Sequence, residues 1–184
     1  EAFFFTVKDA GTYFVYVDSI VVVGLGVNAT YNLSATVRPR VTPGGTCTTY
    51  TSTDVPQTIP TVVGQVSSTI TVPGNPRIAD IDVAINLDHT FMQDLDVHLV
   101  SPAGNDNGLF TDIGAGTVGG LQTKMDLVID DEAGLPPAFA MSAPFHIQPE
   151  LAYRLSWFDG TNAGGTWTLT LRDDATNNNN TLNN

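Results

Sequence analysis

The sequence predicts an all-β protein, a jelly-roll-like β-sandwich with a smaller N-terminal β segment. Short segments in which apolar and polar residues alternate recur along the chain, which is typical of strands with one buried face. Turns rich in Gly, Pro and Asn separate these segments, and no convincing amphipathic helix interrupts them. A succession of short strands and turns indicates two packed sheets.

Residues 1–41 are predicted to form the N-terminal β segment. Its strand candidates are "FFFTV", "TYFVYV", "IVVVGLGV" and "TYNLSATV", which are apolar, aromatic or alternating. Four strands of this length are not expected to bury the apolar face of a sheet by themselves. This segment should therefore pack on the rest of the chain or be the end of a domain whose beginning lies elsewhere.

Residues 42–58 are a linker by composition, with Pro43, Pro56, two glycines and many threonines. The β-sandwich is predicted over residues 59–184. Its strand candidates are, in order, "VSSTITV", "IADIDVAINLD", "DLDVHLV", "MDLVID", "LAYRLSWF" and "TWTLTL".

The chain is strongly acidic, and this excludes some partners. Its 184 residues include 7 basic and 19 acidic side chains, for a net charge of −12, while 42% of the residues are hydrophobic. Binding to nucleic acid needs clustered Lys and Arg, so we expect no nucleic acid partner. No apolar run reaches the roughly 18 residues of a membrane span. A divalent cation suits this charge, although acidity alone also keeps a secreted protein soluble.

The possible glycosylation sites are compatible with an extracellular protein, either secreted or on the cell surface. Cys47 is the only cysteine, so no internal disulfide and no thiolate zinc site is expected. Asn28, Asn32 and Asn179 begin Asn-x-Ser/Thr triplets and are glycosylation candidates. Chance also produces such triplets in a chain rich in Asn and Thr.

Acidic residues gather near the ends of three predicted strands. Asp94 and Asp96 lie on one face of "DLDVHLV", about 7 Å apart, and the segments "VIDDEAG" and "TLTLRDD" also carry neighbouring acids. In a jelly roll, strand ends from distant parts of the chain can meet at one rim. Crowded carboxylates repel, and a Ca²⁺ ion with six to eight oxygen ligands removes that conflict. The alternative is that these acids are solvated turn residues.

Residues 59–184 resemble the P domain (P/Homo B domain), a β-sandwich module. The resemblance rests on "STITV", "HTFMQDLDVHLVSPAG", "DDEAG", "SAPF" and "LSWFDGTNAGGTWTLTLRD" in this order. In proprotein convertases and many bacterial secreted proteases, this module follows a subtilisin-like catalytic domain. The family usually continues past "TLN" with a Trp-containing strand that is not found here. Residues 1–37 are similar to the end of a bacterial pre-peptidase C-terminal domain, in "GTYFVYVD" and "YNLSATV".

The P-domain resemblance also implies calcium, because P domains of bacterial proteases often bind Ca²⁺ at residues that match these motifs. An all-oxygen set of ligands without a thiolate favours Ca²⁺ over zinc or copper. The predicted ligands are Asp94, Asp96, Asp130, Asp131 and Asp173, with Glu132 and Asp159 second in rank.

No catalytic motif was found in the chain, so we expect no enzyme activity. A Gly-x-Ser-x-Gly elbow, a His-Glu-x-x-His pair and a phosphate-binding loop are all missing, and the three histidines are scattered. We expect a non-catalytic, calcium-stabilised accessory module of a secreted, protease-associated protein, which packs on a neighbouring domain or partner. The alternative is a structural subunit of an extracellular filament or adhesive assembly, with identical subunits joined by strand complementation.

Overall fold

The structure is a computed structural model that describes residues 11–12, 46–113, 124–134, 144–150, 153–176 and 180–183. The predicted N-terminal β segment lies outside the described residues, apart from residues 11–12. The three glycosylation candidates, Asn28, Asn32 and Asn179, also lie outside them.

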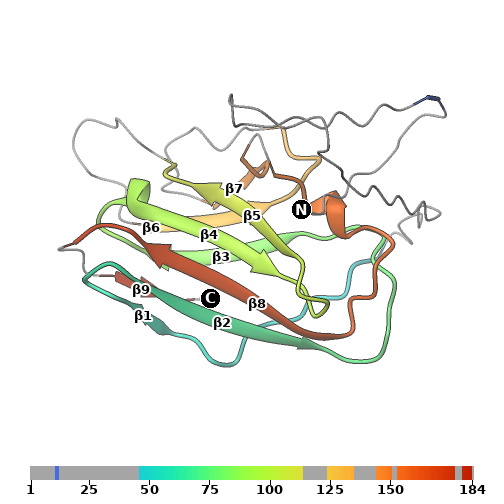
Figure 1. Cartoon of the computed structure of the whole chain (residues 1–184), viewed down its shortest axis with the longest axis horizontal. Helices are drawn as coiled ribbons and strands as arrows, with labels where there is room; N and C mark the ends of the chain where they lie inside the picture. Colours follow the sequence, from blue (N-terminus) through green and yellow to red (C-terminus); the bar gives the residue numbers. More distant parts are fainter. Residues whose placement is uncertain are drawn as a thin grey trace, which may run out of the picture.

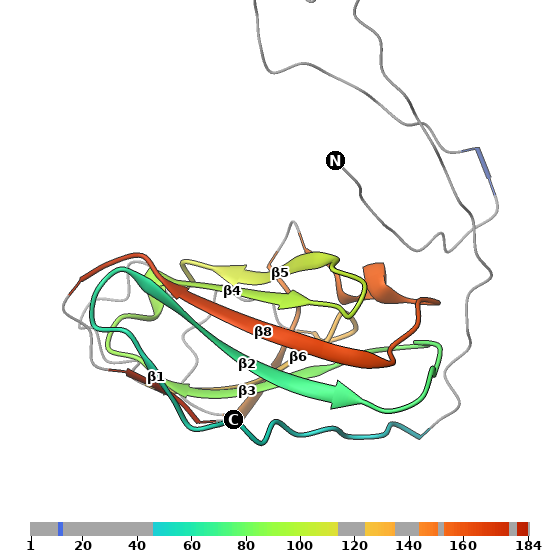
Figure 2. The same ribbon diagram turned by 60° about the horizontal axis from the view of Figure 1, so that its bottom comes forward.

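Two β-sheets pack face to face, as Figures 1 and 2 show, and this confirms the predicted all-β sandwich. The five-stranded sheet has the order β1 (Gln57–Ile59), β9 (Asn180–Leu182), β3 (Val83–Asp88), β6 (Lys124–Ile129) and β7 (Pro144–Ile147). The four-stranded sheet has the order β2 (Gly64–Val72), β8 (Gly165–Asp173), β4 (Leu95–Val100) and β5 (Asp106–Thr111). Neighbouring strands are antiparallel except for β6 and β7, which run parallel.

Alternation along the strands places the core between the sheets. In β4, Leu95, Val97 and Leu99 are buried, whereas the residues between them are only partly covered. In β3, Ile85 and Leu87 face the same core. Because successive side chains of a strand point to opposite faces, this pattern leaves the polar residues of β4 on the outer face of the sandwich.

An aromatic pair closes the core beside the short 3-10 helix η2 (Leu155–Phe158). The rings of Phe158 and Trp167 meet edge to face, with their centroids 5.1 Å apart. Trp167 Nε1 donates a 2.8 Å hydrogen bond to the Ala163 carbonyl, which satisfies the polar atom of this buried indole. Trp167 is therefore a core residue, as its place in an alternating strand predicts. A second 3-10 helix, η1 (Met92–Asp94), precedes β4.

The sandwich begins before residue 59. Gln57 and Thr58, which composition assigns to the linker, belong to β1 and pair with β9. The preceding residues form a strap that we define as 51–56, and Asp54 fastens it to the edge strand β2. Asp54 Oδ2 accepts hydrogen bonds from the main-chain N–H and the hydroxyl of Thr69, at 2.9 and 2.8 Å.

Within the described ranges, no helix is both long enough and apolar enough to span a bilayer.

Candidate functional site

Three of the predicted calcium ligands lie at one end of the sandwich. Strand β4 begins where β8 ends, with Leu95 opposite Asp173 and Asp96 opposite Arg172. Asp94 precedes this pair as the last residue of η1. The main-chain N–H of Asp174 donates to the Asp94 carbonyl at 3.1 Å, so this turn is also held by the backbone.

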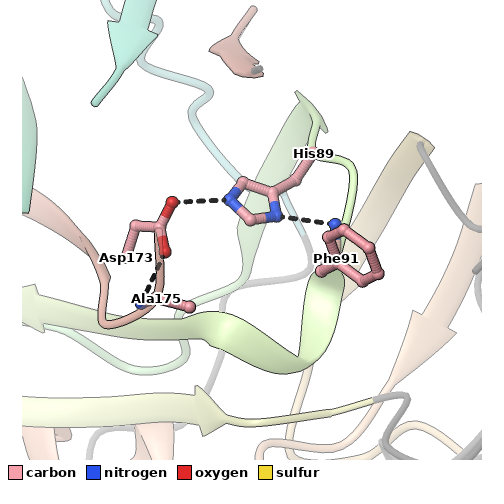
Figure 3. Close-up of polar contacts among 4 residues, drawn as sticks. All are labelled: His89, Phe91, Asp173 and Ala175. Carbon is pink, nitrogen blue, oxygen red and sulfur yellow. Dashed lines mark hydrogen bonds and ion pairs between the residues drawn. The ribbon is translucent and has the colours of Figure 1, made fainter. Parts of the chain in front are cut away.

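Asp173 is completely buried and bonds to a buried histidine (Figure 3). Its Oδ2 lies 3.2 Å from His89 Nε2, and its Oδ1 accepts a 3.0 Å hydrogen bond from the N–H of Ala175. His89 Nδ1 accepts a 3.1 Å hydrogen bond from the N–H of Phe91. Because Nδ1 is an acceptor, the neutral ring carries its proton on Nε2 and donates it to Asp173.

Asp96 lies on the outer face of the four-stranded sheet. Its Oδ2 is 3.4 Å from the Arg172 guanidinium, and both side chains are partly exposed, which makes this a weak surface pair. On the same face, His98 Nδ1 is 2.8 Å from Asp106 Oδ1. The acid–histidine pair on this face therefore joins His98 to Asp106.

The remaining predicted ligands lie at the opposite end of β3. Asp130 follows Ile129, which pairs with Val83 at the start of β3, whereas Asp173 contacts His89, one residue past the end of β3. Five residues of extended strand separate the two ends of β3 by about 17 Å. The five predicted ligands therefore do not meet at one point, and the expectation of a single shared site is corrected to two separate ends.

At this second end the carboxylates also fix the local backbone. Asp131 accepts hydrogen bonds from the main-chain N–H groups of Leu155 and Ser156, both at 2.8 Å, one on each oxygen. Asp131 thus holds the first turn of η2, whose N–H groups have no partner within the helix. Asp130 Oδ1 accepts from the N–H of Glu132 at 2.7 Å. Asp159 is the residue after η2.

Several acids that the sequence reasoning did not select join each end. We define the first acidic group by the charges around Asp112: Asp94, Asp96, Asp112, Glu150 and Asp174. Partial burial and the neighbouring Asp96 and Asp174 raise the pKa of Asp112 above its usual value. Glu150 is tied to this end because its Oε2 accepts from the N–H and the hydroxyl of Thr111, each at 2.8 Å.

The second acidic group consists of Asp80, Asp82, Asp130, Asp131 and Glu132. Burial, followed by repulsion from Asp130 and Asp80, raises the pKa of Asp82, while His146 has a smaller opposing effect. Burial and its contact with Asp130 raise the pKa of Glu132. The alternating pattern around "IADIDV" indicates a strand, but the sequence contains no signal that Asp80 and Asp82 face "DDE".

The charged atoms of each acidic group are all carboxylate oxygens, which are the ligands that hard cations prefer. The pKa of Asp82, Asp112 and Glu132 is raised first by burial and then by neighbouring carboxylates. In the part of the chain that the structure describes, no three His, Cys, Asp or Glu side chains stand close enough together to hold a metal ion. Calcium binding by either group stays a prediction.

Searches against models of protein families and against curated proteins found no match to this chain. Cys47, the single cysteine, is free and exposed.

Proposed function

We propose that this chain is a non-catalytic, calcium-stabilised accessory module of an extracellular, protease-associated protein. The observation that carries the proposal is the excess of negative charge at both ends of a fully formed sandwich. There, burial raises the pKa of Asp82, Asp112 and Glu132, and neighbouring carboxylates from separate strands and loops raise it further. A cation that binds only the folded protein would stabilise it by mass action.

Calcium would link segments that lie far apart in the sequence. At the first acidic group it would link the end of β5 to the segment of Glu150 and to the turn after β8. At the second it would link the entrance of β3 to the turn after β6. Ca²⁺ accepts six to eight oxygens in flexible geometry, so waters and main-chain carbonyls would complete each set.

The accessory role follows from the resemblance to P domains and from the sandwich itself. In a protease-associated protein, such a module packs on a neighbouring domain and contributes stability rather than chemistry. The buried His89–Asp173 pair supports this role, because both side chains are inaccessible and a substrate could not reach them. Extracellular calcium would keep weak sites of this kind occupied.

A structural subunit of an extracellular assembly is the second candidate. It would join identical subunits by strand complementation, in which one subunit adds a strand to a sheet of the next.

Thermal melting of the full chain in Ca²⁺, in Mg²⁺ and in chelator tests the calcium proposal. We expect the melting temperature to fall with chelator and to return with Ca²⁺. Asp112→Asn and Glu132→Gln should each reduce the Ca²⁺ response. Asp126→Asn is the matched control, because Asp126 is an exposed acid in the middle of β6. Identical melting curves in Ca²⁺ and in chelator would refute the proposal.

A further inference from the structure

The side chain of Tyr153 lies on the outer face of the four-stranded sheet. The segment that carries it runs along β5, because the N–H of Glu150 donates to the Leu109 carbonyl at 2.8 Å and the N–H of Tyr153 donates to the Glu150 carbonyl at 2.7 Å. Its ring covers Gly108, which lies opposite His98 in the ladder of β4 and β5. Directly opposed residues share a face, and the face of His98 is the outer one.

The ring lies flat on the strand. A Cβ atom at Gly108 would overlap Cζ, Cε1 and Cε2 of the Tyr153 ring at nearly equal distances. A ring that approached tip first would meet that position with its hydroxyl oxygen, so the ring turns its face toward the strand. Its other face points away from the sheet, and the side chain is only half-buried. An aromatic face of this kind offers apolar contact area beside polar groups.

Polar side chains surround the ring on the same face. The ring centroid of His98 is 6.1 Å from that of Tyr153, and the two ring planes are 60° apart. His98 Nδ1 lies 2.8 Å from Asp106 Oδ1, and these two side chains are 34% and 59% exposed. Two residues before His98 on β4, Asp96 lies 3.4 Å from the guanidinium of Arg172. We call these five residues the tyrosine platform.

The acids of the platform act on the phenol hydroxyl. Burial, followed by the negative charges of Glu150, Asp96 and Asp106, raises the pKa of Tyr153 above its usual value. The hydroxyl therefore keeps its proton at neutral pH and can donate a hydrogen bond to a ligand.

The platform combines hydrogen-bond donors with acceptors. Asp96 and Asp106 accept, whereas Arg172 and the Tyr153 hydroxyl donate. In its neutral form, His98 carries its proton on Nδ1, which faces Asp106, and leaves Nε2 as an acceptor. Sugar hydroxyls both donate and accept, so they match this mixture. An organic cation needs acceptors alone, and the positive charge of Arg172 would oppose it.

We propose that the tyrosine platform binds a neutral polysaccharide of β-1,4-linked pyranose rings. One sugar ring would stack its face of C–H groups on the open face of Tyr153. Equatorial hydroxyls project from the edge of such a ring, where they would bond to His98, Asp106 and Arg172. This binding activity goes beyond the accessory role, because it gives the module a ligand of its own.

The outer face of the sheet has room for further sugar rings. Across β4 from the platform, Thr170 lies opposite His98, and Thr168 lies opposite Val100. Both threonines are partly exposed on β8 and share the outer face, because they are two residues apart. An extended chain of rings could therefore continue from Tyr153 over hydroxyl groups.

Calorimetric titration of the full chain with cellohexaose and with chitohexaose, in buffer with Ca²⁺, tests this proposal. We expect saturable binding of at least one of them, and the comparison shows whether glucose or N-acetylglucosamine rings are preferred. Tyr153→Ala should weaken binding by roughly tenfold or more, because it removes the stacking face. Tyr153→Phe keeps that face and should weaken binding less. Tyr50→Ala is the matched control, because Tyr50 is an exposed tyrosine outside the platform.

Asp106→Ala provides a second variant, because a side chain as exposed as Asp106 can be removed without unfolding the protein. It should also weaken binding of the sugar. The imidazole NMR signals of the histidines locate the ligand: those of His98 should shift on titration, and those of the buried His89 should not.

Three results would overturn the proposal. The first is no binding of either oligosaccharide at millimolar concentration, and the second is binding that Tyr153→Ala and Asp106→Ala leave unchanged. The third is a shift of the His98 signals with tetramethylammonium but with neither sugar, which would assign the platform to an organic cation. The calcium response of Tyr153→Ala should be unchanged, so failure here is separate from failure of the calcium proposal.

Discussion

Asp173 and His89 form a hydrogen-bonded pair, 3.2 Å apart, that joins the two sheets of the sandwich at one end. Asp173 ends β8 in the four-stranded sheet, and His89 follows β3 in the five-stranded sheet. Neither side chain is exposed to solvent. A buried carboxylate is costly unless it accepts hydrogen bonds, so this pair specifies how the sheet ends meet.

Removing the histidine should therefore destabilise the fold. In His89→Phe, the Asp173 carboxylate stays buried with fewer donors, and we expect a loss of about 3 kcal/mol in the free energy of unfolding. Urea denaturation of His89→Phe, Asp173→Asn and the double variant measures the coupling. If the double variant loses as much stability as the two single variants together, the interaction between His89 and Asp173 contributes nothing to stability.

The strap should come loose in acid because Asp54 fastens it. Hydrogen bonds from Ser52, Ser68 and Thr69 hold the pKa of Asp54 far below its usual value of 3.8. Its contribution to stability is thus present above pH 3.8 and is lost as the pH falls toward the lowered pKa.

Asp54→Asn should cost about 1 kcal/mol at neutral pH, since the site is partly solvated. The difference from the unsubstituted protein should shrink below pH 3.8. Stability curves from pH 2 to 7 provide the measurement, and a difference that stays constant over that range would contradict this account.

The contribution of Asp112 to stability should depend on pH in the opposite way to that of Asp54. Its pKa is raised, so its proton is held more tightly in the folded protein, and that stabilisation is lost as the pH rises through the raised pKa. Without calcium, Asp112→Asn should stabilise the protein at neutral pH by less than about 1 kcal/mol. With calcium, the same substitution should destabilise it. Thermal melting at pH 7, once in chelator and once in Ca²⁺, measures the change in stability that Asp112→Asn causes in each buffer. The same change in both buffers would exclude a cation at the first acidic group.

The packing of the Tyr153 ring should depend on the glycine at position 108. The ring of Tyr153 lies against Gly108 of β5, where a Cβ atom would overlap it. Gly108→Ala should therefore displace the ring and cost about 1–3 kcal/mol. The near-ultraviolet circular dichroism signal should change, and Tyr153→Ala should restore most of the stability lost. A Gly108→Ala protein as stable as the parent would contradict this packing.

The strands could be predicted where alternation is strong, as in β2, β3, β4 and β8. The acids could be predicted as residues near strand ends, but which end each occupies depends on topology that no local pattern contains. Asp130 follows β6 and Asp173 ends β8, yet the two residues lie near opposite ends of β3. Glu150 comes from a segment without strand periodicity, and its place is seen only in the structure, where it bonds to Leu109 and Thr111 of β5.

Calorimetric titration of the full chain with Ca²⁺ at neutral pH tests the central proposal most directly. The account predicts saturable binding that weakens as the pH is lowered, because protons compete for Asp82, Asp112 and Glu132. It also predicts weaker binding in Asp112→Asn or Glu132→Gln and unchanged binding in Asp126→Asn. A chain that takes up no Ca²⁺ at millimolar concentration would contradict it.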